Sequence, residues 1–473
     1  MLLVVLVPFF GSLALPLIGH FSIRLRNYLS LVMVLCSLIF SALLLPVVLS
    51  NQTVSFSPGL DMGFLGKDSI IFRADSLAVF MGMVSSLIGS IIVFYSFGYI
   101  SHYDNQNEYY LMVVLFLGSM MGLVFSSNLI FLYLFWEVSA ICSWRLIGFF
   151  REKDHVIKAD KALLVTFGGA LFMLIGFIMI YMQYGTFDMT RIKHGASISN
   201  EAVLLIMCGI LSKSSTLPFH TWLPDAGVAP SPVTSLLHAA ILVKIGVYVF
   251  ARLFFVTFSL ESVWHHVIPV IAAVSALVSA GAAIIETDIK RIIAYSTISQ
   301  IGFIFLGLSC GSSLGVAGGL LYILMHGLAK GGLFLCAGIV EQNTKTKDIT
   351  KLGGLITAMP VTAITFIACS FSIMGIPPFG GFFCKYMVIG GTVEAGQTWM
   401  AFVFILGAIM TMIYLLRLFI SVFMGNVKTQ PSKEGSSTML ISVSTLAFLS
   451  LAAGLLVYYP SALIQNILKG VTG

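Results

Sequence analysis

The sequence contains very little charge for its length. Only 9% of its 473 residues are Asp, Glu, Lys or Arg, whereas 58% are hydrophobic. A soluble globular chain carries about 25% charged residues. Because too few polar side chains are present to coat a water-soluble body of this size, the composition excludes a soluble protein and indicates a membrane protein.

The sequence also lacks the motifs of cofactor and nucleic-acid binding. Its cysteines stand singly, without a CxxC pair or iron–sulfur spacing, at Cys36, Cys142, Cys208, Cys310, Cys336, Cys369 and Cys384. There is no Walker A loop and no GxGxxG after a strand. No basic run is long enough for nucleic acid. We therefore expect no cofactor, no metal and no nucleic-acid partner, and any electron transfer would take place in other chains.

Long apolar runs are what the sequence does contain. Several exceed the roughly 18–20 residues that cross a bilayer, and they lack the alternation of a β-barrel. The sequence predicts an all-α polytopic membrane protein, a single membrane domain over residues 1–473, with about fourteen transmembrane helices. The predicted spans are residues 1–19, 27–49, 75–100, 109–125, 128–149, 160–184, 201–222, 230–257, 263–285, 291–309, 313–340, 358–392, 397–424 and 438–465.

The loops between these spans predict an orientation. The longest, residues 50–74, contains Pro58, Gly59, Gly63 and Gly66 and is predicted to be an extramembrane hairpin or loop. Residues 1–19 lack a basic start and a cleavage site and are expected to remain as the first span. Loops after odd-numbered spans hold roughly twice as many Lys and Arg residues as the others. The positive-inside rule then places both termini on the outer side.

Four lysines lie deep within predicted spans, each with apolar neighbours on both sides. A charge at the bilayer centre costs at least about 2.5–3.5 kcal/mol, and the only carboxylate at comparable depth is Glu137. One carboxylate cannot neutralise all of these lysines, so we expect some of them to be neutral and able to exchange protons. The four are Lys213, Lys244, Lys330 and Lys385.

Two histidines accompany the lysines. His326 precedes Lys330 by four residues, so the two share a helix face and form a candidate proton relay. His238 precedes Lys244 by six residues, which places them on different faces. A hydrogen-bonded core histidine is an equally good interpretation of His238.

Prolines predict a break beside two of the lysines. Pro218 follows Lys213 by five residues, and Pro377 and Pro378 precede Lys385. Proline opens the helical hydrogen-bond ladder, and freed backbone groups are tolerated in a membrane only where protein or a water-filled cavity satisfies them. Ordinary proline kinks are the simpler interpretation, but a discontinuous helix in each half is typical of ion sites in transporters.

These residues occur in segments that resemble a known family. The segments are NLIFLYLFWEVSAICSW, LSKSSTLPFHTWLPDAGVAPSPVTSLLHAAILVKIGVY, ETDIKRIIAYSTISQIGF, MHGLAKGGLFLCAG and GIPPFGGFFCK. Over residues 70–425 the chain resembles the antiporter-like subunits shared by respiratory complex I, Mrp-type cation/proton antiporters and energy-converting membrane-bound hydrogenases.

The resemblance implies a fold and a set of site residues. It implies two inverted five-helix repeats with broken helices 7 and 12: residues 1–108 hold helices 1–3, 109–257 the first repeat, 263–424 the second and 438–465 helix 14. It also implies a proton path along a hydrated axis. The implied path residues are Glu137, regulating Lys213; His238 and Lys244; the relay His326 and Lys330; and Lys385 at the exit.

The resemblance has departures and leaves the host complex open. Gly168 and Gly169 occupy a region where the distal complex I member carries an acid, and the sequence stops near Gly473 without a long lateral helix. We expect a non-redox, proton-translocating or proton/sodium-exchanging subunit of a redox-driven complex in the cytoplasmic membrane of a prokaryote. Its partners would be further antiporter-like chains, small membrane subunits, a peripheral redox module and lipids. The alternatives are an Mrp-type antiporter subunit and the membrane partner of a proton-coupled inorganic-carbon uptake system.

Overall fold

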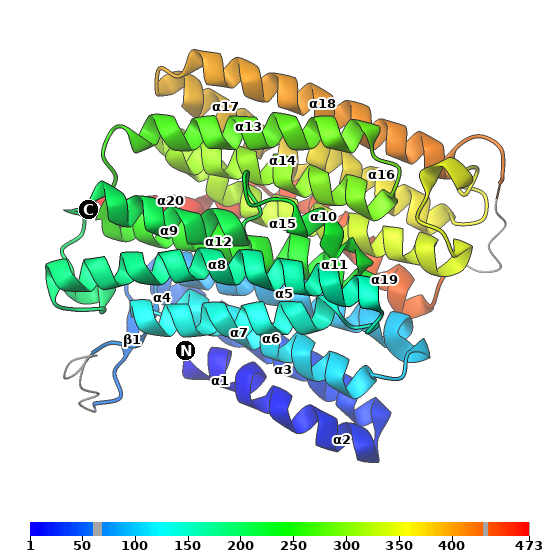
Figure 1. Cartoon of the computed structure of the whole chain (residues 1–473), viewed down its shortest axis with the longest axis horizontal. Coiled ribbons are helices and arrows are strands. Elements are labelled where there is room, and N and C mark those ends of the chain that lie inside the picture. The colour runs from blue at the N-terminus through cyan, green and yellow to red at the C-terminus, as the bar shows by residue number, and fades with distance from the viewer. Residues whose placement is uncertain (60–68, 429–433, 473) are drawn as a thin grey trace.

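The computed structural model describes residues 1–59, 69–428 and 434–472. Within these residues, twelve helices are long and apolar enough to cross a membrane. They lie side by side along the long axis of the molecule in Figure 1, with α1, α2 and α3 at one edge of the stack and α18 at the other. This arrangement confirms the prediction of an all-α polytopic membrane protein.

The N-terminal part forms a small bundle beside the first half of the stack. Its helices are α1 (Leu2–Gly11), η1 (Ser12–Ala14), α2 (Leu15–Phe21), α3 (Ile23–Leu43), α4 (Leu45–Leu49) and α5 (Ser76–Tyr99), followed by η3 (Ile100–His102). Between α4 and α5, β1 (Val54–Phe56) pairs antiparallel with β2 (Phe72–Ala74). The predicted extramembrane loop therefore contains a hairpin, although Gly63 and Gly66 lie outside the described residues.

The first half continues with helices that stop and restart. The elements are α6 (Gln106–Phe125), α7 (Leu129–Ile147), α8 (Lys153–Tyr184), η4 (Met189–Arg191), β3 (Ala196–Ser197), α9 (Asn200–Lys213), α10 (Trp222–Asp225), η5 (Ala226–Val228), α11 (Ser231–Ser235), the π-helix η6 (Leu236–Ala240), α12 (Leu242–Ala251), the π-helix η7 (Arg252–Thr257) and β4 (Phe258–Ser259). The predicted span 230–257 thus contains two π-helical stretches, a departure often found at functional sites.

The second half also contains helices that are interrupted and resume. Its elements are α13 (Trp264–Ile285), α14 (Ile289–Ser309), α15 (Ser313–Thr344), η8 (Ile349–Lys351), α16 (Pro360–Met374), α17 (Gly380–Glu394), α18 (Thr398–Phe423), α19 (Ser437–Leu455) and α20 (Tyr458–Thr472). The last predicted span, 438–465, is wrong in detail, because the helix is interrupted within it: α19 ends at Leu455 and α20 begins at Tyr458. A Cβ atom on Gly454 would lie 2.1 Å from the Pro378 carbonyl oxygen, so α19 approaches the α16–α17 connection closely.

α14 and α15 form the centre of the stack. In the most apolar stretch of each of these two helices, 94% of the residues are buried, whereas in α18 the share is 33%. α15 packs against α5, α11, η6, α14, α16, α17, α19 and α20, and therefore contacts helices of the N-terminal part and of both halves. The most enclosed helices are those that carry or face the predicted relay residues.

Two short bridges recur in the two halves. Asn128 pairs with Asp188, and Asp288 pairs with Asp348. Asp188 accepts hydrogen bonds from the backbone and hydroxyl of Thr190, and Asp348 does the same with Thr350. Each bridge joins the loop before one helix to the loop after the next helix. In Figure 1, α8 ends at the left of the stack, whereas the yellow segment after α15 lies at the right.

Candidate functional site

The predicted path residues are enclosed in the membrane-spanning region. Lys213, Lys244 and Lys330 are fully buried, and Lys385 is 4% exposed. They come from four separate elements: the end of α9, α12, α15 and α17. A buried ammonium group is costly unless polar groups surround it, so their neighbours decide what the site can do.

Lys213 contacts the residue beside the predicted glutamate. Its Nζ donates to the Trp136 carbonyl at 3.1 Å and lies 5.2 Å from the centroid of the Trp136 ring. Glu137 is the next residue on α7, yet no ion pair joins these two described residues, and Oε1 of Glu137 has no hydrogen-bond partner among the described residues. The predicted pair is adjacent in space, but it is not in contact.

The face of α7 that carries Glu137 points outward. Leu134 and Ile141, one turn away on either side, are 52% and 53% exposed, and Glu137 itself is half-buried. These positions share a helix face. Glu137 is therefore accessible both to Lys213 and to whatever covers this face.

The first break begins directly after Lys213. α9 ends there and α10 starts at Trp222, with Pro218 in between. The Leu217 amide donates to Ser275 Oγ at 2.8 Å, and Ser215 Oγ donates to the His220 carbonyl at 3.0 Å. Side chains thus satisfy part of the opened backbone, as a membrane interior requires.

The second break lies beside Lys385. α16 ends at Met374, Gly375 adopts φ +84, and α17 starts after Pro377 and Pro378. A Cβ atom on Gly375 would lie 3.1 Å from Cδ of Lys385, so the opened turn packs against the lysine stem. Lys385 Nζ lies 4.7 Å from the centroid of the Phe303 ring and has no hydrogen-bond partner among the described residues. The aromatic face provides partial electrostatic support for a cation.

Lys244 and His326 join the two halves of the molecule. Lys244 Nζ lies 2.6 Å from His326 Nδ1, which links α12 to α15. His326 Nε2 has no partner among the described residues. Neutral imidazole can accept through one nitrogen and donate through the other, so this contact can pass a proton.

His238 does not fit the interpretation of a hydrogen-bonded core histidine. Neither ring nitrogen has a partner among the described residues, and the ring lies on Phe334 with centroids 4.3 Å apart. It lies in the π-helix η6 and is fully buried. Its polar atoms are therefore left for a water molecule or a change of conformation.

Lys330 reaches a polar network that the sequence analysis missed. Its Nζ donates to Ser296 Oγ at 2.6 Å and to the Ile293 carbonyl at 3.0 Å. Tyr414 donates to Ser296 at 2.8 Å. Gln300 Nε2 lies 3.4 Å from the Tyr414 hydroxyl. The available signal was the segment AYSTISQIGF, where polar side chains four residues apart share one face of an apolar helix.

The network leads back towards His326. Tyr322 donates to Gln300 Oε1 at 2.6 Å, and its ring meets the His326 ring edge-on with centroids 5.9 Å apart. His326 and Lys330 share a helix, as predicted, but both hydrogen-bond acceptors of Lys330 lie on α14. Hydrogen bonds between side chains of α14, α15 and α18 therefore lead from Lys330 to Tyr322, whose ring contacts His326.

An ion-pair cluster, Lys161–Asp225–Arg291–Glu286, fastens one end of the bundle. Asp225 lies 2.7 Å from Lys161 Nζ and 2.7 Å from Arg291 Nη1, and Arg291 Nε lies 2.8 Å from Glu286. Burial alone would raise the pKa of Asp225, but Lys161 and Arg291 outweigh burial and hold it below its usual range. This cluster fixes α10 against α8 and α14, directly beyond the first break.

The described residues contain no group of three or more His, Cys, Asp or Glu side chains that could hold a metal ion. The buried groups are instead amines, imidazoles and hydroxyls in hydrogen-bond reach of one another. The chemistry that such an arrangement can perform is proton exchange.

Sequence comparison gives a family match. Residues 126–411 match the family model described as "NADH:quinone oxidoreductase/Mrp antiporter, TM". The chain is 31% identical over 507 aligned positions to "Na(+)/H(+) antiporter subunit A1" of Staphylococcus aureus strains JH9 and Newman. The alignment covers 99% of this chain and 62% of those relatives, so the chain spans less than two thirds of their length.

Structure comparison gives the same fold. The Mrp complex from Dietzia sp. DQ12-45-1b contains a chain that matches with a TM-score of 0.89 and 22% identity, covering 99% of this chain and 98% of that one. The membrane-bound sulfane sulfur reductase, an archaeal respiratory membrane complex, contains a chain with a TM-score of 0.88 and 21% identity, covering 99% and 97%.

Proposed function

The chain belongs to the NADH:quinone oxidoreductase/Mrp antiporter transmembrane family, as its sequence motifs predicted, and we propose that it is a proton-translocating antiporter-like subunit. The observation that carries this proposal is the 2.6 Å contact between Lys244 and His326, both fully buried. A base and an acid at hydrogen-bond distance in an apolar interior can hand over a proton.

The proposed path runs through the enclosed helices. A proton moves between Lys213 and Lys244, passes from Lys244 to His326, and reaches Lys330 through the Tyr322–Gln300–Tyr414–Ser296 network. Lys385 is the station nearest the exit to the outside. Protein hydrogen bonds join Lys244 to His326 and Tyr322 to Lys330. Water molecules complete the steps at Lys213, between His326 and Tyr322, and at Lys385.

We also infer that the chain has fourteen passes, with two inverted five-helix repeats. The bridges Asn128–Asp188 and Asp288–Asp348 support this, because equivalent loops meet with equivalent capping at opposite ends of the stack. The broken helices 7 and 12 correspond to α9–α10 and α16–α17. Adding these two passes to the twelve long helices gives the proposed number.

Glu137 is the proposed switch for the first lysine. It lies next to Trp136, whose carbonyl holds Lys213, and on a face flanked by exposed Leu134 and Ile141. A half-exposed carboxylate in a membrane-spanning helix needs a polar partner. We infer that a neighbouring membrane subunit covers this face, so that Glu137 alternates between that subunit and Lys213.

Two host complexes are proposed, in order. The relatives named Na(+)/H(+) antiporter subunit A1 align with nearly the whole chain at 31% identity, which favours an Mrp-type cation/proton antiporter. The fold likeness to a respiratory reductase keeps a redox-driven complex with a peripheral redox module as the second candidate. In either case the chain resides in a prokaryotic cytoplasmic membrane with both termini outside and holds no cofactor of its own.

Purification of the native complex separates the two hosts. An Mrp-type host predicts that the co-purifying chains are other small membrane subunits, whereas a redox-driven host predicts iron–sulfur or flavin subunits. Cation/proton exchange in inverted membrane vesicles then tests the function itself. Full exchange activity of an assembled Lys244→Met variant contradicts the proposed path.

A further inference from the structure

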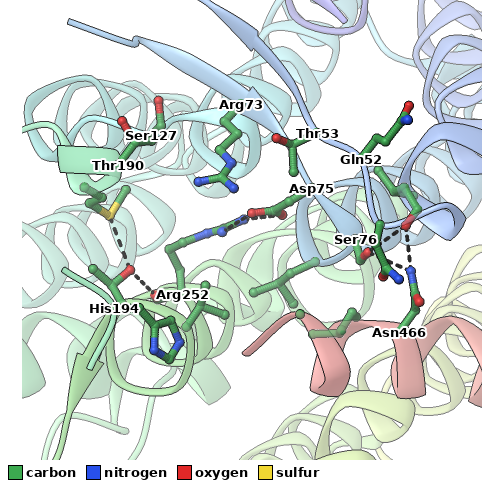
Figure 2. Close-up of a pocket in the computed structure, with 18 of the residues that line it drawn as sticks. Gln52, Thr53, Arg73, Asp75, Ser76, Ser127, Thr190, His194, Arg252 and Asn466 are labelled. Atoms are coloured by element: carbon green, nitrogen blue, oxygen red, sulfur yellow. Dashed lines mark hydrogen bonds and ion pairs between the residues drawn. The ribbon is translucent and has the colours of Figure 1, made fainter. Parts of the chain in front are cut away.

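A large cavity lies apart from the buried lysines, at one end of the helical stack. Its volume is about 920 Å³, within the roughly 300–1,000 Å³ of small-molecule sites. The walls come from the hairpin, the end of α6, the loop after α8, the π-helix η7 and α20 (Figure 2). None of the proposed path residues lines it.

The cavity contains a guanidinium group, that of Arg73, whose hydrogen-bonding capacity is not fully used by the described residues. Arg252 binds Asp75 through two contacts, Nη1–Oδ2 at 2.5 Å and Nη2–Oδ1 at 2.8 Å. Figure 2 shows Arg73 pointing towards the same pair, and its Nε is buried without a hydrogen-bond partner among the described residues. Two guanidinium groups therefore face one carboxylate.

That carboxylate is ionised and already engaged. Burial would raise the pKa of Asp75, but the charges and hydrogen bonds of its neighbours, Arg252 first, hold it below its usual range. Asp75 also caps α5 by accepting from the Ala78 amide at 2.9 Å. Asp75 accepts two hydrogen bonds from Arg252 and one from the helix end, which is most of its capacity, so Arg73 has room for another anion.

The rest of the lining combines basic and apolar side chains. Lys193, His194 and Lys469 line the cavity and are exposed, and Asp75 is the single carboxylate among the lining residues. Val48 and Ile467 are among the apolar lining residues. An anion with an apolar portion would match both kinds of side chain.

The position of the cavity along the stack is that of the membrane interface. α5 begins and α6 ends at its walls, and both are long enough to span a bilayer. Spanning helices end near the headgroup region. Arg73, Lys193 and Lys469 therefore lie at the depth where lipid phosphates are found.

We propose that this cavity binds a phosphate-bearing anion of headgroup size, with Arg73 as its main ligand. The planar guanidinium group matches two phosphate oxygens at once, and Lys193 and Lys469 add positive charge at the rim. The volume fits a whole headgroup better than an isolated ion. The phosphate belongs to a phospholipid of that leaflet or to a soluble phosphate ester, and the experiment separates these sources.

The test measures ligand-dependent thermal stability of the protein purified from membranes with its accompanying subunits. After delipidation, one arm adds phosphatidylglycerol, a second adds phosphatidylcholine of the same chain length, and a third adds glycerol 3-phosphate. A ligand that binds the folded state raises the midpoint by mass action. Native mass spectrometry counts the retained lipid. Stabilisation by phosphatidylglycerol alone identifies the lipid source, and stabilisation by glycerol 3-phosphate identifies a soluble ester.

Four variants make the test specific. Arg73→Gln is expected to lose most of the stabilisation. Arg73→Lys is expected to keep part of it, since lysine keeps the positive charge but lacks the paired N–H donors of the guanidinium group. Arg24→Gln removes an exposed arginine outside the cavity and is expected to behave as wild type. If Arg73→Gln does not fold, Lys193→Gln is expected to weaken binding instead. Equal stabilisation of wild type and Arg73→Gln overturns the proposal, as does equal stabilisation of wild type and Lys193→Gln where Arg73→Gln does not fold. No stabilisation by any ligand overturns it too.

Discussion

Ser296 Oγ accepts a hydrogen bond from Lys330 at 2.6 Å and so joins the lysine of α15 to the neighbouring helix α14. Tyr414 on α18 donates to the same oxygen at 2.8 Å. One small hydroxyl thus connects three helices around a buried amine. This makes Ser296 the residue through which the network can be tested with the smallest change of volume.

Ser296→Ala is expected to slow exchange several-fold while the protein still assembles. Lys330 keeps the Ile293 carbonyl at 3.0 Å, so its side chain stays in place, and losing one hydrogen bond costs about 0.5–1.5 kcal/mol of stability. Tyr414→Phe should have a similar effect. Tyr386→Phe, at a tyrosine that is 68% exposed, is the matched control. Wild-type exchange by both network variants would remove the network from the path.

Lys244→Met and His326→Leu should each reduce exchange roughly tenfold or more, since each removes one partner of a proton transfer. The double variant should be hardly worse than either single variant, because the partners act as one unit. Exchange rates of the two single variants and the double variant in inverted vesicles, normalised to assembled complex, complete this double-mutant cycle. Multiplying losses would show that the two residues act independently. Lys153→Met, at an exposed lysine, is the control for charge.

Glu137→Gln should leave the complex assembled but sharply reduce ion translocation. At an effective dielectric near 20, one charge at about 4 Å is worth roughly 4 kcal/mol, enough to switch the protonation of a nearby lysine. Glu152→Gln, an exposed glutamate before α8, serves as the matched change. Normal translocation by the assembled Glu137→Gln protein contradicts the switch.

Lys213→Met and Lys385→Met should fold as well as wild type or better, because a buried charge is replaced by an apolar chain of similar length. Exchange should nevertheless fall, since methionine carries no proton. Lys385→Glu should retain part of the activity, because a carboxylate also exchanges protons. Thermal stability and vesicle exchange, measured on the same preparations, separate the two effects. Wild-type exchange by both methionine variants would make these lysines structural.

The stabilising effect of Asp225 should depend on pH. Since its folded-state pKa lies below the unfolded value, its stabilisation is present above about pH 4 and is lost as the pH falls through the folded value. Asp225→Asn should therefore lower the thermal midpoint at pH 7, and the difference from wild type should shrink under acid. Asp104→Asn, at an exposed aspartate, should show neither effect. A difference that grows with acidity contradicts this assignment.

The residues that carry charge in apolar surroundings were predictable from the sequence. A lysine between apolar runs, such as Lys244, is expensive wherever the helix packs, so its presence alone signals a site. The break after Lys213 was predictable for a similar reason, since Pro218 cannot continue a helical ladder.

Contacts between distant helices were not predictable. Tyr414 and Ser296 are 118 positions apart, and serine and tyrosine are common in membrane helices, so neither stands out before packing brings them together. The interruption between α19 and α20 was missed because residues 438–465 hold no Asp, Glu, Lys or Arg and only one proline, Pro460. Lys213 donates to the Trp136 carbonyl, and this partner was not predictable because every residue carries a backbone carbonyl.

The partners of Lys213 and Lys330 are neutral oxygens: the carbonyls of Trp136 and Ile293 and the hydroxyl of Ser296. Such acceptors bind an amine as well as an ammonium group, whereas a carboxylate strongly prefers the charged form. A proton can therefore leave either lysine while the side chain keeps its anchor. The positions of Lys213 and Lys330 therefore do not depend on whether they carry the proton. When the proton leaves, the electric field along the stack changes without any prior rearrangement of the helices.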